Sequence, residues 1–217
     1  MSLALFLDRM LGYLFPTHCL VCTTEGKDLC ARCMASLGDP KPSNHDWIIS
    51  LWNYRDPHVE TIMRHVKNNP NRRIATLIAP VMCAKLREAA RDPATPFSAI
   101  TRAIIVPIPI GRARYRSRGY NQSLLLARPL AKQLRRTIAT NVLVKSRTTK
   151  KQGTTKNRAE RLANLKNSFV VNHPRAIRGR DIIIVDDITT TGSTLVEARE
   201  TLLRAGARHV VAITVAN

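Results

Sequence analysis

The sequence is poor in acidic and in aromatic residues. It has 15 Asp and Glu against 35 Lys and Arg, which gives a formal net charge of +20. Residues 100–217 hold 23 basic and 6 acidic side chains, a net charge of +17, whereas residues 1–50 are close to neutral. Such a segregated positive field favours a polyanionic partner such as nucleic acid, and the alternative is an ordinary solvated basic surface. Only Tyr115, Tyr120 and Phe169 are aromatic after residue 100, so base stacking would add little to such binding.

The sequence also lacks an apolar run long enough for a helix to cross a bilayer. The segment from Leu3 to Phe15 is apolar, but Asp8 and Arg9 interrupt it and no basic residue precedes it, so it lacks the layout of a secretion signal. Its apolar positions follow helical spacing, which predicts an amphipathic helix that docks on its own protein. Peripheral membrane attachment is the alternative, although the polar face is not basic. We therefore expect no export and no stable membrane insertion.

Four of the five cysteines form two C-x-x-C pairs, Cys19 with Cys22 and Cys30 with Cys33. Four thiolates at this spacing predict a structural zinc knuckle or ribbon with no open position for hydrolysis. Two disulfides or a redox dithiol are the alternatives. Disulfides need an exported protein, and a redox motif does not need a second pair. Cys83 lies alone in a helical pattern, which predicts a small buried hydrophobe.

The run IIIVDDITTTGST, from Ile182 to Thr194, combines three physical features. Four aliphatic residues predict a buried parallel strand, and Asp186 and Asp187 follow where that strand is expected to end. A turn rich in hydroxyls and backbone amides then leads into a helical pattern. The turn comprises Thr189, Thr190, Thr191, Gly192, Ser193 and Thr194. The helix dipole and the unpaired amides favour an anion, and the carboxylates can accept hydrogen bonds from sugar hydroxyls. The pattern therefore predicts a site for a ribose 5-phosphate.

The same run resembles the phosphoribosyl pyrophosphate (PRPP) loop of type I phosphoribosyltransferases, with a departure at Thr189, where that family usually has an aliphatic residue. The alternative is a strand-to-helix connection whose hydroxyls only cap the helix. Capping needs one hydroxyl and gives no reason for consecutive aspartates. In an enzyme, Asp186 and Asp187 would hold the ribose 2′ and 3′ hydroxyls, and Thr190 to Thr194 would cradle the 5-phosphate. A Mg²⁺ ion would help to stabilise the departing pyrophosphate.

A second basic motif follows the predicted strand that ends at Val106. Its arginines fall on alternate positions with tyrosines interleaved, and they are Arg112, Arg114, Arg116 and Arg118. We expect a loop near the carboxyl end of a strand, where guanidinium groups could bind the pyrophosphate of PRPP or the backbone of a nucleic acid. The sequence does not separate these uses. Asn121 is expected to cap the next helix.

The order of predicted elements indicates an α/β fold. Strands are expected at 47–54, 103–106, 142–145, 181–185 and 210–215, with helices at 57–68, 74–90, 122–136 and 193–205. Strands that alternate with helices imply a parallel sheet, with ligands bound outside the carboxyl ends of its strands. We predict two parts: residues 1–45, with the N-terminal helix and the zinc finger, and residues 46–217, a phosphoribosyltransferase-like domain.

Taken in order, these motifs resemble the ComF family of competence-associated proteins. The resemblance lies in FPTHCLVC with LCARC, in VPIP followed by RSRGYNQSLLLA, in QGTTKNRAERLANLKNSF, and in VDDITTTGST. It implies a cytoplasmic bacterial protein with a zinc finger fused to a type I phosphoribosyltransferase-like domain, linked to natural transformation and DNA uptake. A helicase-like uptake protein is a partner that the resemblance suggests.

Two functions from different classes follow. As a binding module, the protein would bind PRPP at the 186–194 loop and single-stranded DNA on its basic face, chiefly through the phosphate backbone. As a catalytically active phosphoribosyltransferase, it would transfer the phosphoribosyl group to a nucleobase or amine acceptor. The basic stretch from Lys145 to Arg161 would then form a hood that excludes water, and a solvated loop is its alternative.

Overall fold

The protein is described by a computed structural model, in which residues 17–68, 70, 72–100, 102–146 and 168–217 are placed. The helix expected at 3–15 lies outside the described residues, as does nearly all of the 145–161 stretch. Among the helices of the described part, none has the length and apolar character needed to cross a membrane.

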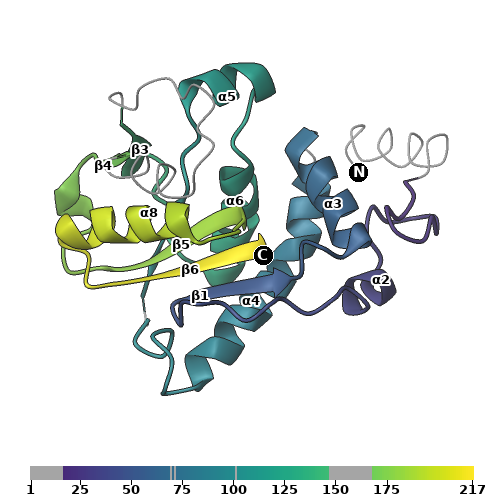
Figure 1. The fold of residues 1–217 in the computed structure, drawn as a ribbon, viewed down its shortest axis with the longest axis horizontal. Helices are drawn as coiled ribbons and strands as arrows, with labels where there is room; N and C mark the ends of the chain where they lie inside the picture. The colour runs from purple at the N-terminus through teal and green to yellow at the C-terminus, as the bar shows by residue number, and fades with distance from the viewer. Residues whose placement is uncertain (1–16, 69, 71, 101, 147–167) are drawn as a thin grey trace, which may run out of the picture.

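A parallel sheet of four strands forms the centre of the molecule, in the order β1-β6-β5-β2 (Figure 1). Its strands are β1 (Ile48–Trp52), β2 (Ile104–Pro107), β5 (Asp181–Ile188) and β6 (His209–Ala216). Every residue of β5 from Asp181 to Asp186 is buried, and so is every residue of β6 after His209. Burial on both faces explains why these strands consist of near-continuous aliphatic runs without alternation.

Helices cover both faces of this sheet. The covering helices are α4 (Arg72–Arg91), α6 (Gln122–Leu134) and α8 (Ser193–Arg204), and α3 (Pro57–Asn68) precedes α4. In Figure 1, α8 lies in front of the sheet, and α4 and α6 lie behind it. Beyond β2 the chain adds one further parallel bridge, between Ile105 and Ile138. The backbone bonds from Ile105 N to Thr137 O and from Ala139 N to Ile105 O extend the sheet there.

The connections reverse direction between β5 and β2. The crossover from β5 through α8 to β6 moves along the sheet towards β1, whereas the crossovers through α4 and α6 move the opposite way. Right-handed crossovers that run in opposite directions put their helices on opposite faces. The carboxyl ends of β5 and β2 therefore flank a topological switch point, which is where doubly wound sheets bind ligands. Asp186 and Asp187 come from one side of this point, and the arginine motif follows the other.

Two parts of the sequence fold differently from the expectation. The strand expected at 142–145 is β3 (Leu143–Lys145), which is not in the parallel sheet but pairs antiparallel with β4 (Phe169–Val171) in a separate two-stranded sheet. The arginine motif, expected as a loop, is the helix α5 (Arg112–Arg118). A short 3-10 helix, η1 (Pro174–Ala176), precedes β5.

The cysteine-containing segment packs against the rest of the chain. It includes the short helix α2 (Ala31–Ala35), and the buried residues Leu29 and Leu37 join the same hydrophobic cluster as the central sheet. Gly38 N donates to Asp56 Oδ2 at 2.8 Å, and Gly38 O accepts from Asn53 N at 2.9 Å. A boundary between residues 45 and 46 stays a prediction.

Candidate functional site

The two aspartates at the carboxyl end of β5 have different surroundings. Asp186 is buried, and its Oδ1 accepts from Ser123 Oγ at 2.7 Å and from Asp187 N at 2.9 Å. Asp187 is half-buried, and its Oδ1 accepts from Ile188 N at 2.8 Å. The strand continues to Ile188, three residues further than its aliphatic run. Asp187 therefore has the carboxylate that a ligand can reach more easily. The carboxylate of Asp186 is held in place by its hydrogen bond from Ser123.

Burial changes the acidity of Asp186. Removal from water and, next in size, the negative charge of Asp187 raise its pKa to about 7, while the hydrogen bond from Ser123 opposes the shift. A carboxyl group with a pKa near neutrality can exchange a proton with its surroundings under ordinary conditions. Strongly shifted carboxyl groups of this kind gather at functional sites, which agrees with the position of Asp186 at the switch point.

The hydroxyl-rich turn leads directly into α8, as the motif predicts. Gly192 is the N-cap residue with φ of +74°, and no side chain caps the helix in the usual way. Thr191 Oγ1 lies 2.7 Å from Ser193 Oγ, and it accepts a long hydrogen bond of 3.4 Å from Ser193 N. Thr189 N is bonded to Ala216 O on β6. Apart from this bond to Ser193 N, no described side chain caps the first turn of α8, and its remaining amides suit a phosphate group as a partner.

The helical conformation of α5 divides its arginines into two sets. Residues four apart lie on the same side of a helix, so Arg112 pairs with Arg116, and Arg114 pairs with Arg118 on a different side. All four are exposed, and no acidic side chain of the described residues forms an ion pair with them. At most one of these two pairs of arginines can face the aspartates. The other pair faces away from them and is exposed.

The start of α6 joins the two sides of the switch point. Asn121 caps this helix as expected, because its Oδ1 accepts from Ser123 N at 3.0 Å and its Nδ2 donates to Ile108 O at 2.9 Å. Ile108 N in turn donates to Val185 O, next to Asp186. Tyr120 has a structural role, since its hydroxyl donates to Val66 O at the end of α3. The geometry around Asp186 is therefore set by residues that follow the arginine motif.

Lys145 is a candidate site residue to which the sequence assigned no separate role. It stands on β3, with Nζ 4.2 Å from the centre of the Phe169 ring. Its pKa is lowered, first by burial and then by the positive charge of Arg114, while the charges of Asp186 and Glu197 oppose the change. Lys145 therefore lies within electrostatic range of both α5 and the end of β5. Because the positive charges of Lys145 and Arg114 repel each other, an anion bound near both would be stabilised.

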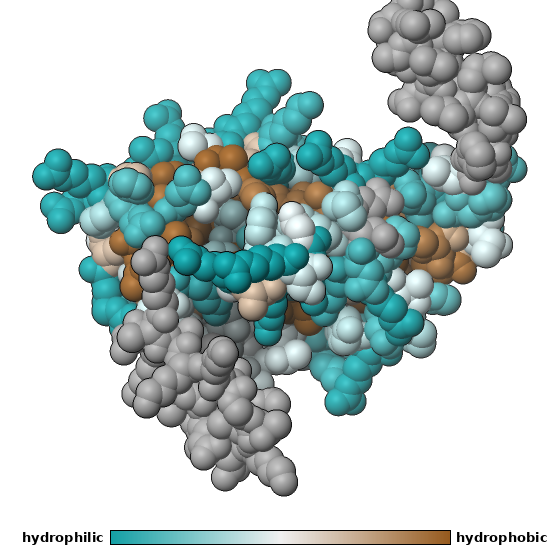
Figure 2. All heavy atoms as spheres, turned by 90° about the horizontal axis from the view of Figure 1, so that it is seen from above, coloured by the Kyte–Doolittle hydropathy of each residue, from teal (hydrophilic) through white to brown (hydrophobic). Residues whose placement is uncertain are grey.

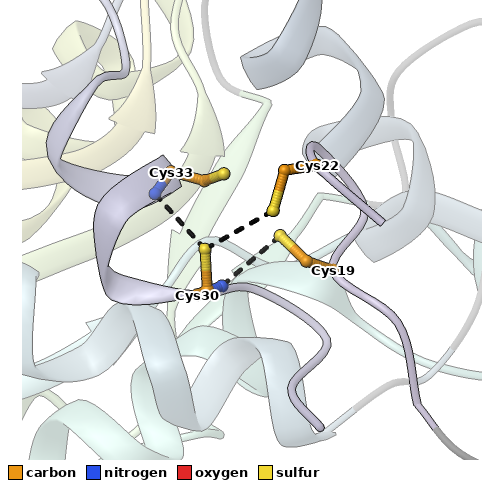
Figure 3. A group of neighbouring side chains, drawn as sticks. All are labelled: Cys19, Cys22, Cys30 and Cys33. Atoms are coloured by element: carbon orange, nitrogen blue, oxygen red, sulfur yellow. Dashed lines mark hydrogen bonds between the residues drawn. The ribbon is translucent and has the colours of Figure 1, made fainter. Parts of the chain in front are cut away.

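The four cysteines of the N-terminal segment form one cluster, as predicted (Figure 3). Their sulfur atoms all lie within 4.8 Å of one another, and Cys22 Sγ is 3.8 Å from Cys30 Sγ. Four sulfurs held about 2.3 Å from a tetrahedral zinc would be about 3.8 Å apart. No cysteine forms a disulfide, which contradicts the disulfide alternative, and Cys83 is buried as a free thiol. The residues present fit a closed four-thiolate metal site.

The acidities within the cluster also favour a cation. The hydrogen bond with Thr24 is the main cause that lowers the pKa of Cys22 to about 5. The pKa of Cys33 is raised to about 12, chiefly by its interactions with Cys22 and Cys30. Without a positive charge beside it, Cys33 therefore stays protonated where Cys22 is ionised. A divalent ion would remove this conflict, because thiolates are the forms that bind metal.

Comparison with known proteins places these features in a family. The model of the phosphoribosyl transferase domain matches residues 121–217, which include both aspartates and the turn before α8. The DNA utilization protein YhgH of Escherichia coli K12 is 32% identical over 181 residues, which cover 83% of this chain and 74% of that protein. Its namesake in Salmonella typhi is 31% identical and covers 88% of this chain and 86% of its own length. The competence protein ComFC of Bacillus subtilis is 33% identical over 48% of this chain and 39% of its own.

The chain belongs to the ComF family. Membership confirms the fold class and the family that the ordered motifs indicate. Among solved structures, a glutamine PRPP amidotransferase from B. subtilis aligns with 70% of this ComF protein and 30% of its own chain. The identity is 15% and the TM-score 0.43, too low to support an argument.

This ComF protein also has a cavity beside the turn before α8 that no sequence motif indicates. The cavity has a volume of about 130 Å³ and lies between residues 41–45 and residues 189–192. Segments about 150 residues apart in the sequence thus form its walls. No local pattern could reveal this meeting, because the sheet topology alone brings the two segments together.

Proposed function

We propose that this protein binds PRPP with Mg²⁺ at the switch point between β5 and β2. The observation that carries the proposal is the arrangement at the end of β5. Asp187 is accessible there, and the uncapped first turn of α8 begins a few residues later. A carboxylate beside an anion site matches a ribose hydroxyl beside its 5-phosphate.

Different residues bind the ribose, the 5-phosphate and the pyrophosphate of PRPP. Asp187 accepts hydrogen bonds from the ribose hydroxyls, with Asp186 behind it. Residues Thr190 to Thr194 hold the 5-phosphate with backbone amides and hydroxyls. Arg114 and Lys145, on the far side of the switch point, hold the pyrophosphate through charge-assisted hydrogen bonds. When bound, Mg²⁺ would neutralise charge between the phosphate oxygens of PRPP.

The remaining basic surface is proposed to bind single-stranded DNA. Figure 2 shows that hydrophilic residues dominate the face of the molecule seen from above, with only small apolar areas between them. The arginines of α5 that turn away from the site, with the exposed Tyr115 between them, suit a nucleic acid backbone. The names of the relatives, which refer to DNA utilization and competence, agree with such a role. We place the protein in the cytoplasm during DNA uptake, with a helicase-like protein as a candidate partner.

We propose zinc as the metal of the cysteine cluster, held by Cys19, Cys22, Cys30 and Cys33. With all four positions filled by thiolates, zinc would be structural. Its contribution is to hold the segment whose buried residues join the main core.

Catalysis is the second candidate, and the match to the phosphoribosyl transferase domain favours it. A nucleobase or amine would form a bond to C1 of the ribose as the bond from C1 to the pyrophosphate oxygen breaks. The pyrophosphate leaves with the bonding electron pair, and the acceptor loses its proton. The residues described above would position the ligand and complement its charge.

PRPP binding is tested by equilibrium dialysis with the zinc-loaded protein. Asp187→Asn should weaken binding at least about tenfold, the cost of one charge-assisted hydrogen bond. Asp92→Asn is the matched control, since Asp92 is exposed beyond the end of α4. Equal affinity in the wild type and in Asp187→Asn would refute the site. Release of pyrophosphate with a panel of nucleobases and amines, abolished in the Asp186→Asn and Asp187→Asn double variant, would establish catalysis.

DNA binding is tested by fluorescence anisotropy with single-stranded oligonucleotides of different sequence over a range of salt concentration. Binding through the phosphate backbone predicts a steep fall in affinity as salt increases and weak preference between sequences. An affinity that changes little with salt would contradict the proposed basic interface.

A further inference from the structure

The cavity beside the turn before α8 is lined on one side by a segment from far away in the sequence. Lys41, Ser43, Asn44 and His45 face Thr189 to Gly192 across it. Its volume of about 130 Å³ is roughly ten times the space that one buried water requires. A phosphate group with part of its sugar fits such a space.

The 41–45 segment is fixed in this position by the end of the chain. Lys41 N donates to Asn217 Oδ1 at 3.0 Å, and Asn217 Nδ2 donates to Lys41 O at 2.7 Å. Asn217 follows directly after β6, the strand next to β5. These hydrogen bonds hold the backbone of the 41–45 segment next to the carboxyl end of β6. The proposed ligand lies at the same end of the sheet.

His45 makes the closest approach to the turn. A Cβ atom at Gly192 would lie 3.1 Å from His45 Cδ2 and 3.3 Å from its Nε2, so a glycine is needed there for space as well as for its positive φ. The imidazole packs on Trp47, with ring centres 5.3 Å apart, and the guanidinium of Arg199 lies 4.8 Å from the centre of the Trp47 ring. The position of the ring against Gly192 is therefore well defined.

The lining of the cavity selects for an anion. Lys41 and His45 bring donors that can carry positive charge, and the threonines bring hydroxyls. None of the described residues that line the cavity is acidic. A site with cationic and hydroxyl donors and no carboxylate suits a phosphate group better than a base or a cation.

We propose that Lys41 and His45 contact the 5-phosphate of the bound sugar, so that the N-terminal segment completes the phosphoribosyl site. This inference rests on the proposed function, because it assigns part of that ligand. His45 is a binding residue that reaches the phosphate from the side opposite the helix amides. The cysteine-containing segment and the sheet thereby share one ligand.

Three probes separate this inference from the proposed function. PRPP carries both phosphate groups, ribose 5-phosphate has only the 5-phosphate, and inorganic pyrophosphate with Mg²⁺ represents the other end. Calorimetry with each probe is applied to the full zinc-loaded chain and to His45→Ala, His45→Phe and Arg114→Ala. His58→Ala is the matched control, because His58 is exposed on α3 and does not line the cavity.

His45→Ala should weaken PRPP and ribose 5-phosphate about tenfold and leave pyrophosphate unchanged. Arg114→Ala should weaken PRPP and pyrophosphate and leave ribose 5-phosphate unchanged. His45→Phe keeps a ring against Trp47 but has no N–H donor, so it should lose as much affinity as His45→Ala. His58→Ala should bind all three probes like the wild type.

Other outcomes overturn the inference. If His45→Ala binds ribose 5-phosphate like the wild type while PRPP binding is intact, the assignment of His45 is wrong and the proposed function stands. Recovery of affinity in His45→Phe would show a packing role only. Equal loss for pyrophosphate would show general damage to the fold. A wild-type protein that binds neither PRPP nor ribose 5-phosphate would refute the proposed function together with this inference.

Discussion

The replacement Asp186→Asn tests whether the buried carboxyl group at the end of β5 costs stability. Burial raises the pKa of Asp186 from 3.8 to about 7, so the protonated form favours the folded state. The stabilisation from this protonation is complete below about pH 4 and is lost as the pH rises towards 7. Asn has no proton to lose in this range. The variant should therefore become more stable relative to the wild type as the pH increases.

The size of the effect follows from the shift. At 1.36 kcal/mol per pKa unit, ionisation of Asp186 costs the folded state about 2 kcal/mol at about pH 5 and about 4 kcal/mol at about pH 8. The relative stability of Asp186→Asn should rise by about 2 kcal/mol between these conditions. This difference does not depend on how well the Asn side chain is hydrogen-bonded, because that cost, about 1–3 kcal/mol, is the same at both.

Urea unfolding of both proteins at the two pH values measures this difference. The pH dependence of metal binding cancels, since both proteins have the same cysteine cluster. Asp56, whose pKa is lowered, loses its contribution only at more acidic pH. A relative stability that stays constant or falls between about pH 5 and about pH 8 would refute the reasoning. A rise in the relative stability of Asp186→Asn would show that the ionised Asp186 destabilises the fold, as functional residues often do.

Three further predictions concern other parts of the molecule. Lys145→Gln should weaken pyrophosphate binding about tenfold by calorimetry, whereas Lys85→Gln, on α4, should not, and equal losses would contradict the role of Lys145. Metal analysis should find one zinc per chain, and Cys30→Ser should lower both the zinc content and the unfolding temperature; a full zinc complement in this variant would contradict the four-cysteine site. Asp181→Ala leaves Arg208 without its 2.6 Å partner at the opposite end of β5. Urea unfolding should show a loss of stability with PRPP affinity unchanged, and a loss of PRPP affinity in the folded variant would mean that the two ends of β5 are coupled.

The sequence predicts most of the central sheet because the relevant signals are local. The aliphatic run before Asp186 has the composition of a doubly buried strand, and α3 has the expected limits, 57–68. The turn before α8 combines residues that are adjacent in the chain, so its order and its relation to the strand can be inferred directly. The cysteine cluster is equally local, because all its members lie within 15 residues.

The errors occur where local signals are weak or misleading. The alternate arginines of α5 are expected in a loop, but the seven residues between Gly111 and Gly119 form two turns of helix, with Gly119 in the left-handed conformation that ends it. Strand β3 has the same apolar character as a sheet strand, yet its partner is β4, more than 20 residues away, and the pairing is antiparallel.

The candidate site residues that the sequence did not indicate take part in long-range contacts. Ser123 reaches Asp186 across 63 positions, and residues 41–45 meet the turn at 189–192 only because β6 ends beside them. Lys145 belongs to a basic stretch in the sequence, and its distinction from the other lysines comes from its contact with Phe169 and the charge of Arg114. Such roles follow from topology, which the sequence pattern specifies only in outline.

A crystal structure of the zinc-loaded protein with Mg²⁺ and PRPP tests the central claim most directly. The 5-phosphate should lie within the turn from Thr190 to Thr194, and the ribose hydroxyls should lie against Asp187. The pyrophosphate should lie towards Lys145 and α5. A ligand bound elsewhere, or bound with its 5-phosphate outside this turn, would contradict the account.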